Sequence, residues 1–451
     1  MLHLLKSFAP LTLYIGWLVT IMMSMSGNVL PGIQLLIPLF PLQNVIERMH
    51  RLPLGKDLND FLLIAMTFGW IIARSSRGER IMDRTPLNGL LILYFLYTLI
   101  TLLLGSVYLH TSSIFSIGDV RVQMWKNYVV FLLVYFLVVN NVREPAQMKK
   151  LFWLMLLSML IMDYYTVPQI RWMSSIVSRT KLHGTFLNLG PNELSAFYAT
   201  YPFVLLGVML FEKQPIRKFA LGFLIWVAVF CVLFMYSRGA YLAVLAGTLV
   251  LALFRYRILL VPLIVLIVCW QVLLPPSVVE RIKQTESVDN TLDASAAKRL
   301  DIWQDAISMF KKSPVVGVGF ATLAVTGLRY GFADPHNIYL KMLTEQGIIG
   351  LGFLLVIFGI SFYSGFRLYS RAEDGFLKGL GLGFMCCVAG TMVGNLFGNR
   401  WTHQQLGAFY WVFLALVVRG NMIKPEKKRG KEKRHRAQRP SIDQQYGVLR
   451  G

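Results

Sequence analysis

The sequence predicts an all-α, polytopic membrane protein with about twelve transmembrane helices. Composition is the first indication, because the chain is 55% hydrophobic and only 15% charged, whereas soluble domains carry about 25% charged residues. The second is that apolar runs near the ~20 residues needed to cross a bilayer recur along the whole length. These runs lie near 11–26, 28–46, 58–74, 87–109, 124–141, 150–168, 193–211, 218–236, 239–254, 258–274, 337–366, 376–396 and 404–419.

The first two runs are short and are broken by Gly27, Pro31 and Gly32, so we count them as one interrupted passage. This gives twelve spans, and two separate passages would give thirteen. We expect one integral membrane domain over residues 1–420, which includes a polar loop at 275–336. No cleavable signal peptide is expected, because the first run has a weak basic flank and further hydrophobic runs follow at once.

The segment 421–451 is polar and strongly basic, and it supplies much of the formal charge of +22. In a membrane protein such a run most often marks the cytoplasmic side and contacts anionic lipid, so nucleic acid is not an expected partner. Its low apolar content predicts a disordered tail. The basic residues are Lys424, Lys427, Lys428, Arg429, Lys431, Lys433, Arg434, Arg436 and Arg439.

A cytoplasmic tail orients the short loops, because basic residues favour the cytoplasmic side. Basic loops then fall inside as far back as about residue 75, with those at Arg74 and Arg143 among them. The loop 275–336, which has balanced charge, falls outside. The scheme fails at 47–57, where three basic residues also fall outside, so the parity of the N-terminal spans stays open.

The outer loop contains the pattern of an amphipathic helix over 294–312. Its expected apolar face follows helical spacing and consists of Leu300, Trp303, Ile307 and Phe310. Ser313-Pro314 and the glycines that follow end the helix. Such a helix suits a position along the membrane surface, where it can roof a cavity over the bundle.

Basic residues in short outer loops need an explanation, because the positive-inside rule depletes them. Arg238 lies in a tight turn between two apolar runs, where a guanidinium is costly unless it faces a polar cavity or an anion. Its five donors suit a phosphate or diphosphate. The alternative is an arginine that reaches lipid headgroups. Arg299 on the loop helix and the outer pair Arg179 and Lys181 are weaker candidates, since a lone loop charge is usually solvated.

His336 lies where the outer loop re-enters the membrane. A neutral histidine can accept a proton from a hydroxyl, so general base is one interpretation, and a helix-capping or interfacial histidine is the other. Helical periodicity from His336 would put Tyr339 on its face and Glu345 on the opposite side. We therefore expect Glu345 to pair with Lys341, one turn before it, and not to orient the histidine.

Several other chemistries have no sequence support. There is no Walker loop, GxSxG or HExxH motif. The four cysteines lie in apolar runs with no metal-ligand or disulfide spacing. We expect neither a metal nor a cofactor. A transporter would be expected to show internal repeats with matching interrupted helices, and we find none.

These residues together resemble the O-antigen ligase and polymerase superfamily of bacterial membrane proteins. The resemblance covers about 180–400, and the first 170 residues match only as generic spans. It rests on Ser237-Arg238-Gly239-Ala240, Arg299-Leu300 with Trp303, Gly317-Val318-Gly319, Pro335-His336-Asn337-Ile338-Tyr339-Leu340 with Glu345, Gly347 and Gly350, and Gly184-Thr185-Phe186 with Pro191-Asn192-Glu193.

The resemblance implies a GT-C-like glycosyltransferase of the bacterial inner membrane, acting on its periplasmic side without a metal. The donor would be a glycan on undecaprenyl diphosphate, and direct displacement would invert its anomeric centre. His336 would be the catalytic base, and Arg238 and Arg299 would bind the diphosphate. Further candidates for substrate binding are Arg179, Lys181, Asn192, Trp303 and Asn337.

The acceptor distinguishes the functional alternatives. A ligase would use lipid A-core, and a polymerase would use a second lipid-linked glycan. A flippase for the same glycan, or a scaffold that binds other polysaccharide-assembly proteins, are the competing classes. A scaffold would leave the outer-face arginines without a role.

Overall fold

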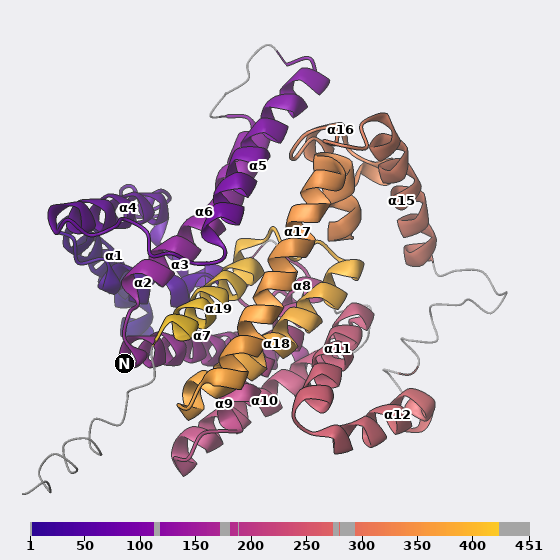
Figure 1. The fold of residues 1–451 in the computed structure, drawn as a ribbon. Coiled ribbons are helices and arrows are strands. Elements are labelled where there is room, and N and C mark those ends of the chain that lie inside the picture. The colour runs from indigo at the N-terminus through magenta and orange to yellow at the C-terminus, as the bar shows by residue number, and fades with distance from the viewer. Residues whose placement is uncertain are drawn as a thin grey trace, which may run out of the picture.

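The computed structural model describes residues 2–111, 118–171, 181–187, 189–273, 279 and 294–423. Over these residues the chain is almost entirely helical, which confirms the all-α class, and Figure 1 shows the helices gathered into one bundle. Arg179, the first part of the outer loop and the basic tail from 424 onward lie outside the described residues.

The helices are α1 (Leu2–Met25), α2 (Leu30–Leu39), α3 (Gln43–Met49), α4 (Leu58–Ser76), α5 (Asn88–Tyr108), α6 (Val120–Asn141), α7 (Pro145–Arg171), α8 (Pro191–Thr200), α9 (Pro202–Met209), α10 (Pro215–Phe234), α11 (Arg238–Phe254), α12 (Leu260–Val268), α13 (Trp270–Leu273), α15 (Ala294–Lys312), α16 (Leu323–Thr326), α17 (Ile338–Arg371), α18 (Gly375–Gly394) and α19 (Gln404–Met422), with short 3-10 turns η2 (Arg257–Leu259), η3 (Arg329–Gly331) and η4 (Asn395–Phe397).

Many of these helices have the length and composition of membrane spans. Among the described residues, seven apolar helices are long enough to cross a membrane, namely α4, α5, α6, α7, α10, α17 and α18 continued through η4. Shorter apolar helices occur at Pro10–Met25, Leu30–Leu39, Arg238–Phe254 and Arg257–Val268. The protein is therefore a multi-pass membrane protein, and the count of twelve crossings stays a prediction.

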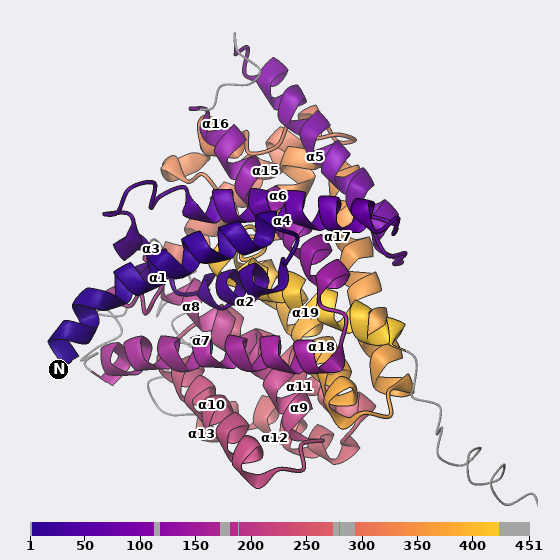
Figure 2. The same cartoon turned by 90° about the vertical axis from the view of Figure 1, so that its left-hand side faces the viewer.

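The N-terminal helices bear on that count. The Tyr14 hydroxyl of α1 donates to the Pro53 carbonyl just before α4, at 3.0 Å. At its other end, α1 is followed by Gly27, which packs against Ala73 near the end of α4. Helices α1 and α4 therefore run in the same direction, side by side, as Figure 2 also shows. Because the chain must return between them through α2, this arrangement favours the alternative of thirteen segments.

The centre of the bundle is built around α18. This helix packs on α9, α11 and α17, and a stripe of small residues lets the backbones approach closely. Gly207 of α9 faces Gly379 and Gly383 of α18 so closely that a methyl group at any of the three would collide with backbone. Next to it, α19 is buried along almost its whole length. These closely packed helices support the loop segments that follow α15 and α18.

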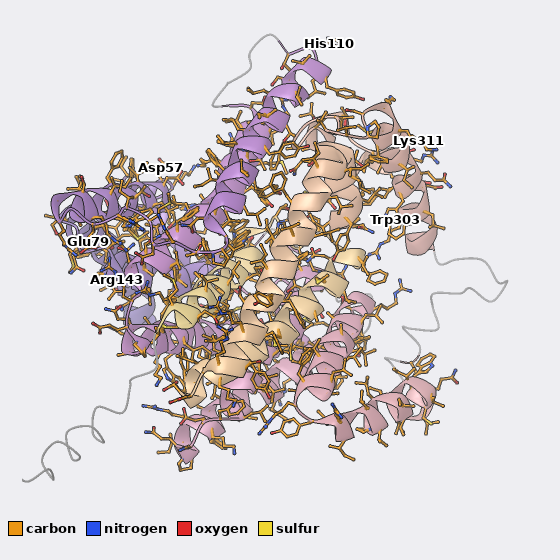
Figure 3. All side chains as sticks on the ribbon, viewed as in Figure 1. Asp57, Glu79, His110, Arg143, Trp303 and Lys311 are labelled. Atoms are coloured by element: carbon orange, nitrogen blue, oxygen red, sulfur yellow. The ribbon has the colours of Figure 1, made fainter. Side chains whose placement is uncertain are left out.

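One end of the bundle carries a cluster of ion pairs. Arg74 pairs with Asp83 at 2.9 Å, Arg419 with the same carboxylate at 2.8 Å, and Arg143 with Glu79 at 2.9 Å. Figure 3 shows Glu79 and Arg143 on one side of the molecule and Trp303 and Lys311 of α15 on the other. Residues that the positive-inside rule assigns to one face are thus in contact, and the outer loop lies away from them.

The predicted loop helix is present as α15, with the expected bounds, and the face that packs on protein is not the predicted apolar face. Ile302 and Ala306 are buried against Leu323 and Leu328, whereas Leu300 and Ile307 are exposed. The position of the predicted apolar face along the membrane surface stays a prediction. The helix has apolar residues on more than one side. The residues that pack on protein, Ile302 and Ala306, each precede by one position a residue of the predicted apolar face.

The segment that follows α15 inserts its backbone into α17. At Gly347, α17 breaks with a φ of +66°. The carbonyls of Thr344 and Glu345 accept from Val318 and Gly319, each at 2.9 Å. In return the amide of Ile348 donates to the Pro314 carbonyl at 2.9 Å. This exchange of hydrogen bonds anchors the outer loop to the bundle between α15 and α16.

Gly347→Ala is expected to destabilise the fold by roughly 2–4 kcal/mol, because the methyl group would strain a positive φ and collide with the carbonyl of Val315. Gly352→Ala, five residues later on the same helix, is the matched control, since a Cβ there meets nothing within 4 Å. Thermal unfolding of both variants in detergent measures the difference. Equal midpoints would contradict the proposed anchor.

Candidate functional site

A polar cavity of about 560 Å³ lies where the outer loop meets the bundle. Its walls come from α3, α6, α8, the start of α17 and the 399–405 turn, and they mix carboxylates, amides and imidazoles with a few aromatic rings. Such a lining suits a ligand rich in hydroxyl groups. The polar residues that line the cavity are Gln43, Asn127, Tyr128, Glu193, Asp334, His336, Lys341, Glu345, Gln346, Asn399, Thr402, His403, Gln404 and Gln405.

His336 lines this cavity, but it is not part of a helix. Asn337 is the N-cap of α17, and its side chain accepts from the amides of Tyr339 at 3.0 Å and Leu340 at 3.1 Å. His336 precedes the cap and has a φ of +52°. The expected shared face of His336 and Tyr339 was therefore wrong, because helical periodicity does not reach His336. A left-handed non-glycine residue costs about 1–3 kcal/mol, and such residues gather at functional sites.

The imidazole of His336 packs edge-on against the Phe332 ring, with 5.4 Å between centroids. In the described part of the chain it makes no hydrogen bond to another side chain. Its backbone amide donates to Asp334 Oδ1 at 2.7 Å, which fixes the turn. The backbone turn and Phe332 thus hold the ring in place. Its nitrogen atoms can therefore interact with a ligand in the cavity.

A buried charge network lies directly behind His336. Lys341 Nζ contacts Asp334 Oδ2 at 3.2 Å and Glu345 Oε1 at 3.7 Å, so the predicted Lys341–Glu345 pair is confirmed. Asn399 Nδ2 donates to Asp334 Oδ2 at 2.6 Å. Burial acts to raise the pKa of Asp334, but Lys341, Asn399 and the His336 amide outweigh it and lower that pKa. Asp334 is therefore ionised and positions the His336 turn.

Other sequence candidates have structural duties. Trp303 Nε1 donates to the Pro335 carbonyl at 2.8 Å, which ties α15 to the residue before His336. Asn337 is occupied as a helix cap. Asn192 is half-buried in the first turn of α8, beside Glu193 of the cavity, and Lys181 is exposed. Substrate binding by these residues, as by Arg179, stays a prediction.

An apolar groove of about 610 Å³ lies on the other side of α8. The end of α8, with Tyr198 and Ala199, lines this groove, whereas Glu193 near its start lines the polar cavity. The remaining walls are apolar side chains of α9 to α13, such as Leu242 and Trp270. Arg238, half-buried at the first position of α11, is the cation of the groove lining.

Arg299 is half-buried on α15. Asp301 and Asp305, on the same helix, contact Arg329 at 3.6 and 3.1 Å. The positive charge of Arg299 also reaches Arg400, whose pKa it helps to lower. The structure thus brings Arg299 into electrostatic range of the turn between α18 and α19.

Sequence reasoning missed three residues of this region: Asn399, Arg400 and His403. All three lie in the short outer turn 397–403, where an arginine is unexpected on the positive-inside rule. That rule singled out Arg238 and could equally have singled out Arg400. Neither periodicity nor spacing relates this turn to the His336 turn. The hydrogen bond that connects the two turns joins Asn399 to Asp334, which are 65 residues apart.

His403 makes stability sensitive to pH. Burial lowers the pKa of His403 below its usual 6.5, against Glu193 and Asp334, which raise it, while the charges of Lys341 and His336 lower it further. The unfolded chain therefore binds the proton at a higher pH than the folded one, and stability is lost as pH falls through 6.5. We expect His403→Gln to reduce the loss of thermal stability between pH 7.5 and 5.5, with His50→Gln, at an exposed position, as the control. Parallel pH profiles for His403→Gln and wild type would contradict this.

Comparison with known proteins supports the resemblance noted in the sequence. Residues 223–355 match a family model described as O-antigen ligase. The chain is also similar to an O-antigen ligase of Pseudomonas aeruginosa, with 32% identity over 124 residues, which is 27% of this chain. The match spans 30% of that relative's length. The resemblance to the O-antigen ligase and polymerase superfamily is thereby confirmed. The family match contains Arg238, Arg299, His336 and Lys341 but not Glu193, Arg400 or His403.

Proposed function

We propose, from the match of residues 223–355 to the O-antigen ligase family model, that this protein transfers a glycan from undecaprenyl diphosphate to an acceptor hydroxyl. The acceptor in this proposal is lipid A-core. The reaction takes place at the periplasmic side of the inner membrane. The observation that carries the proposal is the pairing of an apolar groove that includes Arg238 with a polar cavity that contains His336, on the two sides of α8.

The two spaces match the two halves of such a donor. A polyprenyl chain needs a long apolar surface, which the groove supplies in contact with lipid. The diphosphate needs cations, and a guanidinium at the groove suits it because its donors form a fixed fork. The glycan and the acceptor sugar need hydroxyl-binding groups, and the cavity is lined by amides and carboxylates.

The chemistry requires little beyond these groups. The bond that breaks joins the anomeric carbon to the diphosphate oxygen, and the leaving diphosphate takes the electron pair. Arg238 and Arg299 stabilise the negative charge that develops on it. His336 accepts the proton of the acceptor hydroxyl as the new glycosidic bond forms. A single displacement inverts the anomeric centre, and no step calls for a metal.

The test uses the purified full chain with a lipid diphosphate donor, with and without lipid A-core. Formation of a capped core, in the presence of a chelator and only when core is added, is expected. A lengthened lipid-linked glycan in the absence of core would assign the polymerase alternative instead. Movement of donor across a vesicle membrane without any new glycosidic bond would overturn the proposal in favour of a flippase.

A further inference from the structure

Arg400 is a buried cation that the proposed mechanism does not yet use. Its side chain is only 5% exposed, in the turn between η4 and α19. Its amide donates to Asn395 Oδ1 at 3.0 Å, and its Nη1 donates to the Gly394 carbonyl. The Nε atom is buried and has no hydrogen-bond partner. Buried polar atoms in native proteins are almost always paired, so this one calls for an explanation.

The guanidinium lies against the first turn of α11. A Cβ placed on Gly239 would be 3.3 Å from Arg400 Nη2 and 3.5 Å from Nη1. Gly239 directly follows Arg238, and Ser237, the N-cap residue, makes no side-chain cap hydrogen bond. The N-terminus of a helix of this length carries a partial positive charge and favours anions. A buried guanidinium at this position therefore adds to a field that is already positive.

The charge of Arg400 is balanced only at a distance, by Glu193, and not by an ion pair. Burial is the main cause that lowers the pKa of Arg400 to about 10; the charge of Glu193 opposes this shift, and the charge of Arg299 contributes to it. The side chain is still protonated at neutral pH. Among the described residues no carboxylate forms an ion pair with it. Burying a charge without a direct partner is costly. Here the charge of Arg299 and the adjacent N-terminus of α11 add to that cost, and Glu193 offsets only part of it.

A purely structural role accounts for part of this arrangement. The hydrogen bond to Gly394 braces the turn between α18 and α19, and a neutral amide of similar length could make it. It does not account for the retention of a full charge next to Arg238 and within range of Arg299. The missing component is an anion.

We propose that Arg400 is a third positive charge of the diphosphate site, and that the bound diphosphate at the start of α11 is its counter-ion. This inference rests on the proposed function and adds to it a positioning residue that lies outside the family match. The positive charge of Arg400 attracts the diphosphate, and its guanidinium supports the Arg238–Gly239 turn by direct contact.

The test measures binding of undecaprenyl diphosphate to the purified full chain, and the readout is the thermal stabilisation that the ligand causes. Arg400→Gln is expected to weaken binding about tenfold or more, the size expected for a lost charged interaction. Asn395→Ala removes the backbone anchor of Arg400 but no charge, and Arg329→Gln removes an exposed charge. Both are expected to bind within about threefold of wild type, on the same scale.

A second variant keeps the inference testable if Arg400→Gln does not fold. Arg400→Lys retains a charge, but a buried lysine has a depressed pKa. Its binding is expected to be near wild type at pH 6.5 and to fall as pH rises to 9, while wild-type binding stays level. A structural brace would show no such divergence. Binding of both variants equal to wild type at every pH would overturn the inference, whereas a wild-type chain that binds no diphosphate would overturn the proposed function itself.

Discussion

Replacing His336 with alanine is expected to reduce glycan transfer by about 100- to 10,000-fold, the usual contribution of a general base. The acceptor hydroxyl would then have to lose its proton to water. The apolar groove and the arginine sites are left intact, so binding of undecaprenyl diphosphate is expected to stay near that of wild type. Transfer from a lipid diphosphate donor, measured beside donor binding, separates the two effects.

His50→Ala serves as the matched control, because His50 is exposed and lines neither the cavity nor the groove. The imidazole of His336 makes no hydrogen bond within the described residues, so its removal costs little packing beyond the contact with Phe332. Recovery of part of the activity by added imidazole would support a proton-accepting role. Transfer at the wild-type rate by correctly inserted His336→Ala protein would eliminate His336 as the base.

The membrane class and the loop helix were predictable, because both are written in local patterns. Charge depletion and ~20-residue apolar runs predict a polytopic helical protein, and the pattern over 294–312 gave the bounds of α15. The Lys341–Glu345 pair follows from the spacing of one helical turn. Arg238 was found because a charge between two apolar runs violates a strong rule.

The conformation of His336 was not predictable in the same way. It depends on Asp334, which is held by Lys341 from the same segment but also by Asn399, far along the chain. The break of α17 at Gly347 depends on hydrogen bonds from the 314–319 segment. Periodicity describes only neighbours within one helix, so it extended the helix of His336 too far and ran α17 straight through its break.

The apolar groove could not be predicted from the sequence either. Its walls come from α8 to α13, and the proline that opens α9 divides an apolar run that reads as one span. The positive-inside rule could have singled out Arg400, but its burial against α11 follows only from the packing of the helices. Both features arise from contacts between helices, which sequence patterns do not describe.

Lys341→Met is expected to destabilise the protein by about 3–5 kcal/mol, the usual cost of removing one partner from a buried ion pair. Lys341 is only 4% exposed, and its ammonium serves both Asp334 and Glu345. Methionine matches the length of the side chain but leaves two carboxylates without a cation. Thermal unfolding in detergent measures the loss. Lys126→Met is the control, because Lys126 and Asp60 form an exposed pair worth under about 1 kcal/mol.

Neutralising the carboxylates should distinguish charge from packing. The triple variant Lys341→Met, Asp334→Asn, Glu345→Gln removes the unpaired charges and is expected to recover much of the stability, since isolated buried charges are the main cost. A second version with Asp334→Ala in place of Asp334→Asn should in addition reduce glycan transfer, because alanine cannot accept the His336 amide hydrogen bond that fixes the turn, whereas asparagine can. If Lys341→Met were as stable as Lys126→Met, the network behind His336 would not be the buried support that its geometry indicates. If the version with Asp334→Ala kept the transfer activity of the version with Asp334→Asn, Asp334 would have no part in positioning His336.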